Sequence, residues 1–136
     1  MRVAIPEHQG RVAPVFDSCR RILIVVQDHD RDDQVADQDW SALQRATRPG
    51  RLRELAVDLL ICGGISCWME DQIQRCQIRL IPWIAGEIWE VLTALREGRI
   101  SDPCYLMPGR RRCRRGRRLD SLEGCIRQLP DFRKGA

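Results

Sequence analysis

Short apolar runs, separated by glycine and proline, mark the first part of the chain. The runs at 2–5, 12–16 and 21–26 have the length and composition of strands, and their close spacing predicts hairpin-connected, antiparallel pairing. The segment 27–47 is polar and rich in aspartate, which predicts an irregular or edge segment. The first part of the chain is therefore expected to contribute three strands to one sheet.

Helical and strand patterns alternate through the second part of the chain. A short helix is predicted around 52–56, and further helices begin near Ser66 and Gly86, each with apolar residues at helical spacing. The apolar runs 57–62 and 78–82 predict strands, the first of them buried on both faces. This order predicts an α/β fold with a mixed five-stranded sheet, helices packed on it and right-handed parallel crossovers.

Charge divides the chain into two parts. Residues 101–136 hold ten basic and four acidic side chains, whereas residues 1–100 hold thirteen basic and fifteen acidic ones. Seven arginines lie between Arg110 and Arg118. We therefore predict an α/β domain over 1–100 and a basic, flexible, Cys- and Arg-rich tail over 101–136.

Localisation and redox state follow from two further features of the sequence. The apolar run Met1–Ile5 is too short for an export signal, and no run is long enough to cross a membrane. We therefore expect a cytoplasmic protein with no membrane partner. The chain has seven cysteines, an odd number, which favours reduced thiols over a disulfide framework.

The candidate site is the edge of the sheet where the parallel strands end. In open α/β sheets, ligands bind beyond the carboxyl ends of these strands, which here are the loops 6–10, 62–67 and 83–86. The last two loops lead into helices, whose amino-terminal N–H groups favour an anion. Glycines in these loops allow the backbone to approach a ligand closely. The sequence therefore predicts a site for an anionic ligand.

Soft ligands and an imidazole lie in the same loops. The predicted cofactor-binding residues are His8, Cys62, Gly63, Gly64, Cys67 and Gly86, of which His8, Cys62 and Cys67 are the predicted metal ligands. An anion that also accepts thiolate or imidazole is the expected occupant, and a metal–sulfur cluster fits that description. Each choice also has a purely structural explanation. The glycine pair is typical of a tight strand-to-helix turn, and a cysteine at the end of a buried strand, such as Cys62, is often a core residue. Cys67 is the first choice as ligand, because a helix start favours metal binding or redox chemistry at a cysteine.

Three segments match a known pattern: MRVAIPEHQGRVAPVFDSCRRILIV, RELAVDLLICGGIS and IRLIPWIAGEIWEVLTALREGRI. Through them the chain resembles the dinitrogenase iron-molybdenum cofactor biosynthesis family over most of residues 1–100. The resemblance implies a ribonuclease-H-like, three-layer domain that carries iron–sulfur or molybdenum-containing clusters without turnover, with cofactor-assembly or acceptor proteins as partners. Similar sequences carry a His-Phe-Gly triplet where this chain has Val15-Phe16-Asp17. The missing imidazole shifts the expected ligation to His8 and the cysteines.

Two other functions stay open. The arginines of the tail favour salt-dependent binding of nucleic acid or another polyanion. A thiol-based metal sensor would use Cys104, Cys113 and Cys125, whose spacing matches no standard zinc module. We expect no enzyme activity, since nucleic-acid cleavage on such a fold needs clustered carboxylates on the central strands, and the run 2–5 has none.

Overall fold

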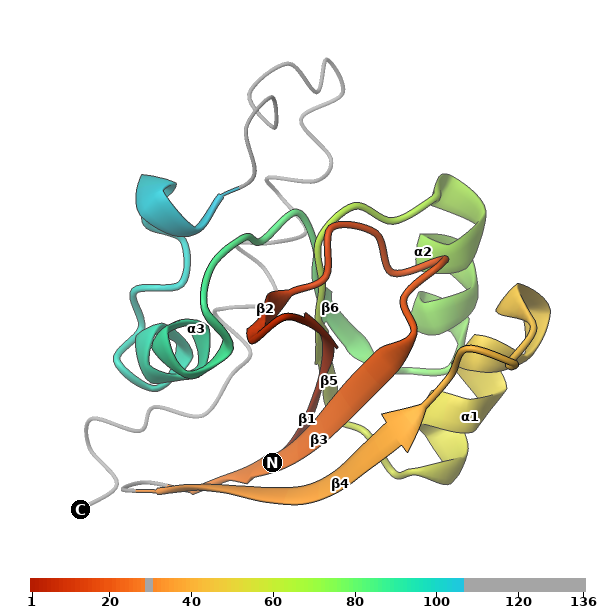
Figure 1. Ribbon diagram of the computed structural model, residues 1–136, viewed down its shortest axis with the longest axis horizontal. Coiled ribbons are helices and arrows are strands. Elements are labelled where there is room, and N and C mark those ends of the chain that lie inside the picture. Colours follow the sequence, from red (N-terminus) through yellow and green to blue (C-terminus); the bar gives the residue numbers. More distant parts are fainter. Residues whose placement is uncertain (29–30, 107–136) are drawn as a thin grey trace.

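The structure is a computed structural model that describes residues 1–28 and 31–106 (Figure 1). The arginine cluster Arg110–Arg118 of the predicted tail lies outside these residues, as do Cys113 and Cys125. In the described part of the chain, no helix is long and apolar enough to cross a membrane.

A mixed sheet is the centre of the fold. The described elements are β1 (Arg2–His8), β2 (Arg11–Val12), β3 (Arg21–Gln27), β4 (Asp32–Asp39), the 3-10 turn η1 (Arg45–Thr47), α1 (Arg48–Glu54), β5 (Leu59–Ile61), α2 (Cys67–Arg75), β6 (Arg79–Ile81), α3 (Ile88–Arg96) and the 3-10 turn η2 (Pro103–Tyr105). The strand order is β4-β3-β1-β5-β6, and β2 pairs with the end of β1. β1 pairs antiparallel with β3 and parallel with β5. The predicted α/β fold with a mixed sheet is confirmed.

The predicted count of five strands is wrong, because the sheet has six strands among residues 1–28 and 31–106. The additional strand is β4, in the polar segment expected to be irregular or at an edge. It pairs antiparallel with β3 along its whole length. Ion pairs join its Asp37 to Arg21 of β3 and its Asp32 to Arg96 of α3. Backbone pairing and these charges stabilise a segment whose aspartates disfavour a strand on composition alone.

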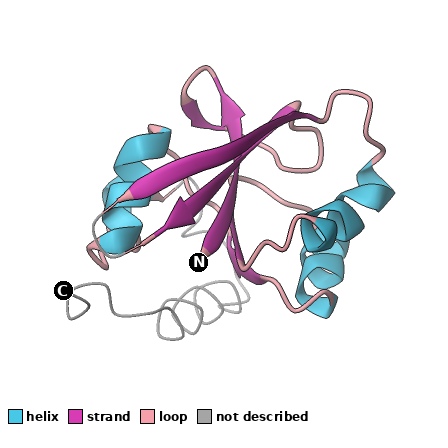
Figure 2. Ribbon diagram, turned by 90° about the horizontal axis from the view of Figure 1, so that it is seen from below, coloured by secondary structure: helices cyan, strands magenta, loops and turns pink. Residues whose placement is uncertain are grey.

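Helices cover both faces of the sheet, as Figures 1 and 2 show. On one face, Val91 and Leu92 of α3 pack in a core with Val25 of β3. On the other face, Leu52 of α1 and Ile73 of α2 belong to a second core. The strands serve both cores because successive side chains of a strand point to opposite faces. The fold therefore has three layers, with the sheet in the middle.

Side chains cap the helices near the positions that the sequence indicated. Ser66 is the N-cap of α2, and its Oγ accepts the Met69 N–H at 3.1 Å. At α3 the N-cap is Glu87, expected inside the first turn, and its carboxylate accepts the N–H groups of Trp89 and Glu90. Gly98, with a φ of 74°, lies just past the end of α3, as expected of a helix terminus.

Contact with the domain continues past residue 100. The Ala85 N–H donates to the Tyr105 carbonyl at 2.7 Å, and Leu106 forms a bridge with Ile84. The side chains of Tyr105 and Leu106 pack against the core on the α3 face of the sheet. The packed part of the chain therefore extends at least to Leu106, beyond the boundary expected at residue 100.

Candidate functional site

Three loops meet where the parallel strands end, and backbone hydrogen bonds join them. The Gly64 N–H donates to the Pro14 carbonyl at 2.7 Å, and the Phe16 N–H donates to the Gly64 carbonyl at 2.8 Å. The Trp83 N–H donates to the Gly63 carbonyl at 2.9 Å, which attaches the third loop. The term strand-end loops is used below for residues 10–17, 62–66 and 83–88.

Glycines allow the strand-end loops to approach one another. A Cβ atom on Gly63 would lie 2.6 Å from the carbonyl oxygens of both Ala13 and Pro14. A Cβ atom on Gly64 would lie 3.2 Å from the Pro14 oxygen. Gly86 has a φ of +143°, a conformation that residues with a side chain rarely adopt. The backbone therefore requires glycine at position 63, is strained by any side chain at position 86, and leaves only a tight fit for one at position 64.

The amino terminus of α2 already holds a carboxylate of the chain. Asp17 accepts the Ser66 N–H at 3.0 Å and the Ser66 hydroxyl at 2.7 Å. Arg45 lies 3.7 Å from the same carboxylate. At α3, the Glu87 carboxylate occupies the corresponding place. The helix starts that were expected to attract an anionic ligand therefore interact with internal carboxylates, because negative charge from either source is stabilised there.

The three predicted metal ligands occupy different environments. Cys62 is fully buried, and burial raises the pKa of its thiol well above the ordinary value. Cys67 is exposed at the start of α2, and His8 is exposed at the end of β1. Among residues 1–28 and 31–106, no three His, Cys, Asp or Glu side chains are placed to hold a metal ion together. The structure therefore does not bring His8, Cys62 and Cys67 together as one ligand set.

A buried arginine joins the segment between β2 and β3 to the segment after β4. Arg48 is 4% exposed, and its Nη1 donates to the Phe16 carbonyl at 2.9 Å and to the Cys19 Sγ at 3.1 Å. Its Nη2 donates to the carbonyls of Trp40 and Leu43, and the guanidinium lies 5.5 Å from the centre of the Trp40 ring. The sequence did not predict this role, because Arg48 begins the polar helix RPGRLRE and no local pattern marks it as buried.

Burial also perturbs the thiol beside Arg48. Desolvation raises the pKa of Cys19 to about 11, although the charge and hydrogen bond of Arg48 act in the opposite direction. Cys19 in turn contributes to the raised pKa of Cys62, after burial, which is the largest cause. Both thiols therefore belong to the core and stay protonated at neutral pH.

Stability is expected to fall as the pH rises from about 9 to about 11. The thiol of an unfolded chain ionises near 9.0, whereas folded Cys19 keeps its proton to about 11. The folded state then binds more protons than the unfolded state, so the free energy of unfolding decreases across this window, by on the order of 2 kcal/mol for Cys19. Urea unfolding of the wild-type chain and of Cys19→Ala measures the effect. The variant should show the smaller decrease, and identical pH profiles would contradict this assignment.

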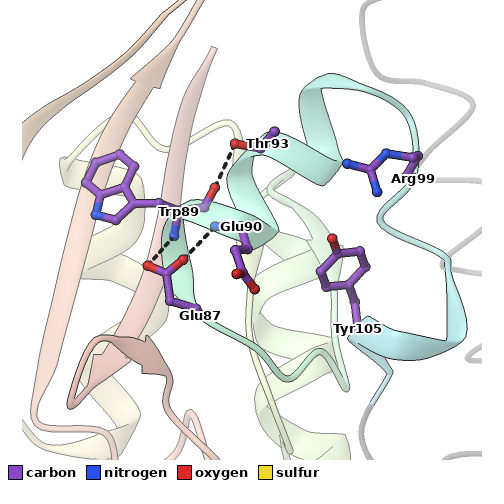
Figure 3. Close-up of a pocket in the computed structure, with 6 residues that line it drawn as sticks. All are labelled: Glu87, Trp89, Glu90, Thr93, Arg99 and Tyr105. Carbon is purple, nitrogen blue, oxygen red and sulfur yellow. Dashed lines mark hydrogen bonds between the residues drawn. The ribbon is translucent and has the colours of Figure 1, made fainter.

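A surface pocket of about 470 Å³ lies beside α3. Its lining residues are Glu87, Trp89, Glu90, Thr93, Arg99 and Tyr105 (Figure 3). Figure 3 shows Glu90 and Tyr105 facing each other across it, whereas the Trp89 indole points to the other side of the helix. A Cβ atom on Gly86 would lie 3.6 Å from the Tyr105 ring. The pocket therefore adjoins the strand-end loops, and the sequence missed it because Tyr105 was expected in the tail.

Comparison with known proteins gives structural matches without sequence matches. No family model matches the chain, and no curated protein matches its sequence. The structure is similar to that of the protein PH0822, with a TM-score of 0.67 and 20% identity, covering 72% of this chain and 90% of that one.

Two further solved structures carry informative names. One is a protein of Methanocaldococcus jannaschii provisionally named a dinitrogenase, with a TM-score of 0.58 and 20% identity, covering 74% of this chain and 92% of that one. The other is a Thermotoga protein provisionally named NifB and placed in the DUF35 family, with a TM-score of 0.55 and 19% identity, covering 72% of this chain and 89% of that one. At these identities the likeness shows the fold, which this chain therefore shares with proteins that have nitrogenase-related names.

Proposed function

We propose that this chain is a non-catalytic carrier, which binds an iron–sulfur or molybdenum-containing cluster as cargo during cofactor assembly or transfer. The observation that carries the proposal is the fold shared with two proteins of nitrogenase-related name, over 92% and 89% of their chains. Cofactor-assembly or acceptor proteins would be its partners. The ribonuclease-H-like relationship of the three-layer domain belongs to the same proposal.

Cys67 is the cargo ligand that we favour. Its side chain is exposed at the edge of the sheet where α/β domains bind ligands. Cys62 is fully buried and its raised pKa keeps it protonated, whereas a metal ligand must be a thiolate. A carrier that supplies one exposed thiolate leaves other positions of the cluster open to a donor or acceptor protein, which suits transfer.

The absence of turnover is also part of the proposal. Cleavage of nucleic acid by two metal ions needs carboxylates that cluster on the central strands. Glu7 is the acidic residue of β1, and its carboxylate pairs with Arg21 at 3.0 Å. It also accepts the Gly10 N–H at 3.0 Å. These contacts give Glu7 a structural role at the turn between β1 and β2.

Cys67→Ser is expected to weaken binding of a reconstituted cluster by at least about tenfold, because it removes the exposed thiolate. Anaerobic reconstitution with iron and sulfide measures this, with sulfur-to-metal charge-transfer absorption and iron and sulfide analysis as readouts. Cys104→Ser is the matched control, since Cys104 is also exposed but lies in η2 rather than at the start of α2. Equal cluster content in the Cys67→Ser and wild-type proteins would contradict this ligand. A wild-type chain that retains no cluster would contradict the carrier proposal.

A further inference from the structure

Large apolar side chains are exposed on the strand-end loops and in the first turn of α2. Val15 is 45% exposed and Trp68 is 43% exposed. The segments that carry these two residues are joined by the hydrogen bonds from Ser66 to the Asp17 carboxylate. The two side chains therefore lie in one region of the surface, where the connection between β2 and β3 meets α2 (Figure 1).

Trp83 adds a partly buried indole ring to this region. Val15 forms a bridge with Gly64, and a Cβ atom on Gly64 would lie 3.4 Å from the Trp83 ring. Trp83 has a φ of 65°, a conformation that is strained for a bulky residue. The fold thus holds a large ring beside Val15 in spite of a backbone cost. The term apolar edge surface is used below for Val15, Trp68 and Trp83.

The sequence after the described residues contains a segment with a matching apolar pattern. Residues 119–129 have apolar side chains at spacings of three and four, which are Leu119, Leu122, Ile126 and Leu129. This spacing predicts a helix with one apolar face. A helix of eleven residues is marginally stable by itself in water, so it requires an apolar surface on which to pack.

The described chain ends close to the apolar edge surface. Its last residue, Leu106, forms a bridge with Ile84, the neighbour of Trp83. The twelve residues 107–118 separate Leu106 from the apolar segment, and they span at most about 40 Å when extended. This length is sufficient for residues 119–129 to return to the surface beside Leu106.

We propose that residues 119–129 dock on the apolar edge surface of the same chain through their apolar face. The short connection from Leu106 gives this segment a high effective concentration at the surface, which favours it over a segment of a second copy. Docking also removes a group of exposed aromatic side chains from water. The proposal does not depend on cluster binding, and its test uses the chain without metal.

Hydrogen exchange in the full chain tests whether residues 119–129 are packed. Their backbone amides are expected to exchange at least about tenfold more slowly than those of a free peptide with the same sequence. Replacing Leu122 and Ile126 together by serine removes two apolar contacts and should abolish this protection. Gln128→Ser is the matched control, because residue 128 lies on the opposite face of the predicted helix, and it should leave most of the protection in place.

Two exposed valines test where the segment docks. Val15→Ser should reduce the protection of residues 119–129 by about threefold or more. Val35→Ser should leave it unchanged, because Val35 is 48% exposed but lies on β4. The exchange of the β3 amides reports in each variant whether the domain is folded. Equal effects of the two valine variants, or a wild-type segment without protection, would overturn the proposal. Protection that rises with protein concentration would also overturn it, since the occupant would then be a second copy.

Discussion

Gly63→Ala is expected to lower the free energy of unfolding by about 3 kcal/mol. The new methyl group would lie 2.6 Å from the backbone carbonyl oxygens of Ala13 and Pro14. A backbone carbonyl cannot turn aside as the end of a flexible side chain can, so the loop itself must shift. That shift would also weaken the hydrogen bond from the Gly64 N–H to the Pro14 carbonyl, now 2.7 Å long. Urea unfolding followed by tryptophan fluorescence measures the change.

Gly50→Ala is the matched control for this prediction. Gly50 lies inside α1, and no atom would come within 4 Å of an added Cβ. Alanine is the better helix former, so this variant should raise the free energy of unfolding by about 0.5–1 kcal/mol. The same chemical change is thus expected to have opposite signs at the two positions. A Gly63→Ala protein as stable as the wild type would contradict the packing of the strand-end loops.

Arg48→Ala is expected to lower the free energy of unfolding by about 4 kcal/mol. Arg48 is 4% exposed, and its guanidinium donates to backbone carbonyls of Phe16, Trp40 and Leu43. Removing it leaves these buried acceptors without their donor and opens a cavity beside the Trp40 ring. Arg48→Lys retains the charge, but one ammonium group cannot reach carbonyls on several sides, so it should recover less than half of the loss. Calorimetric and urea unfolding both report the change.

Arg51→Ala tests whether burial is the reason for the effect of Arg48. Arg51 lies on the same helix, is exposed, and pairs with Glu54 at 3.3 Å. Exposed pairs of this kind contribute little, so a change within about 0.5 kcal/mol is expected. If Arg48→Ala and Arg51→Ala had the same small effect, the hydrogen bonds of Arg48 would not be the link described above.

Most of the fold could be predicted from the apolar pattern. The runs 2–5, 21–26 and 57–62 became β1, β3 and β5, because branched apolar side chains at strand length leave few alternatives. β4 was missed as a strand because aspartate is rare in strands. Its stabilising partners are the preceding strand β3 and two arginine side chains, Arg21 and Arg96, which lie 16 and 64 positions from the aspartates they pair with. A local pattern cannot report partners supplied by the rest of the sheet.

The meeting of loops at one edge of the sheet was easier to predict than the contacts within them. Cys62 ends a run that is apolar on both faces, so the pattern could not distinguish a core residue from a ligand. Asp17 reaches Ser66 across 49 positions of sequence, and no spacing rule connects the two. Tyr105 follows the last strong helical pattern, yet it packs against the core. In each case the missing information is a tertiary contact. Side-chain direction at the end of a strand and long-range capping both depend on such contacts.

The position of β1 between an antiparallel and a parallel partner has a consequence for how the protein folds. β1, β3 and β4 are near neighbours in sequence, so their pairing requires only short loops to close. The other edge of β1 pairs with β5, in which Leu59 is the partner of Val3. This pairing is parallel and joins segments far apart in sequence, so it is expected to form slowly during folding. Until β5 has paired with β1, the apolar edge of β1 is exposed and can form hydrogen bonds with strands of other chains. Folding yield at high protein concentration therefore depends on how quickly β5 covers that edge.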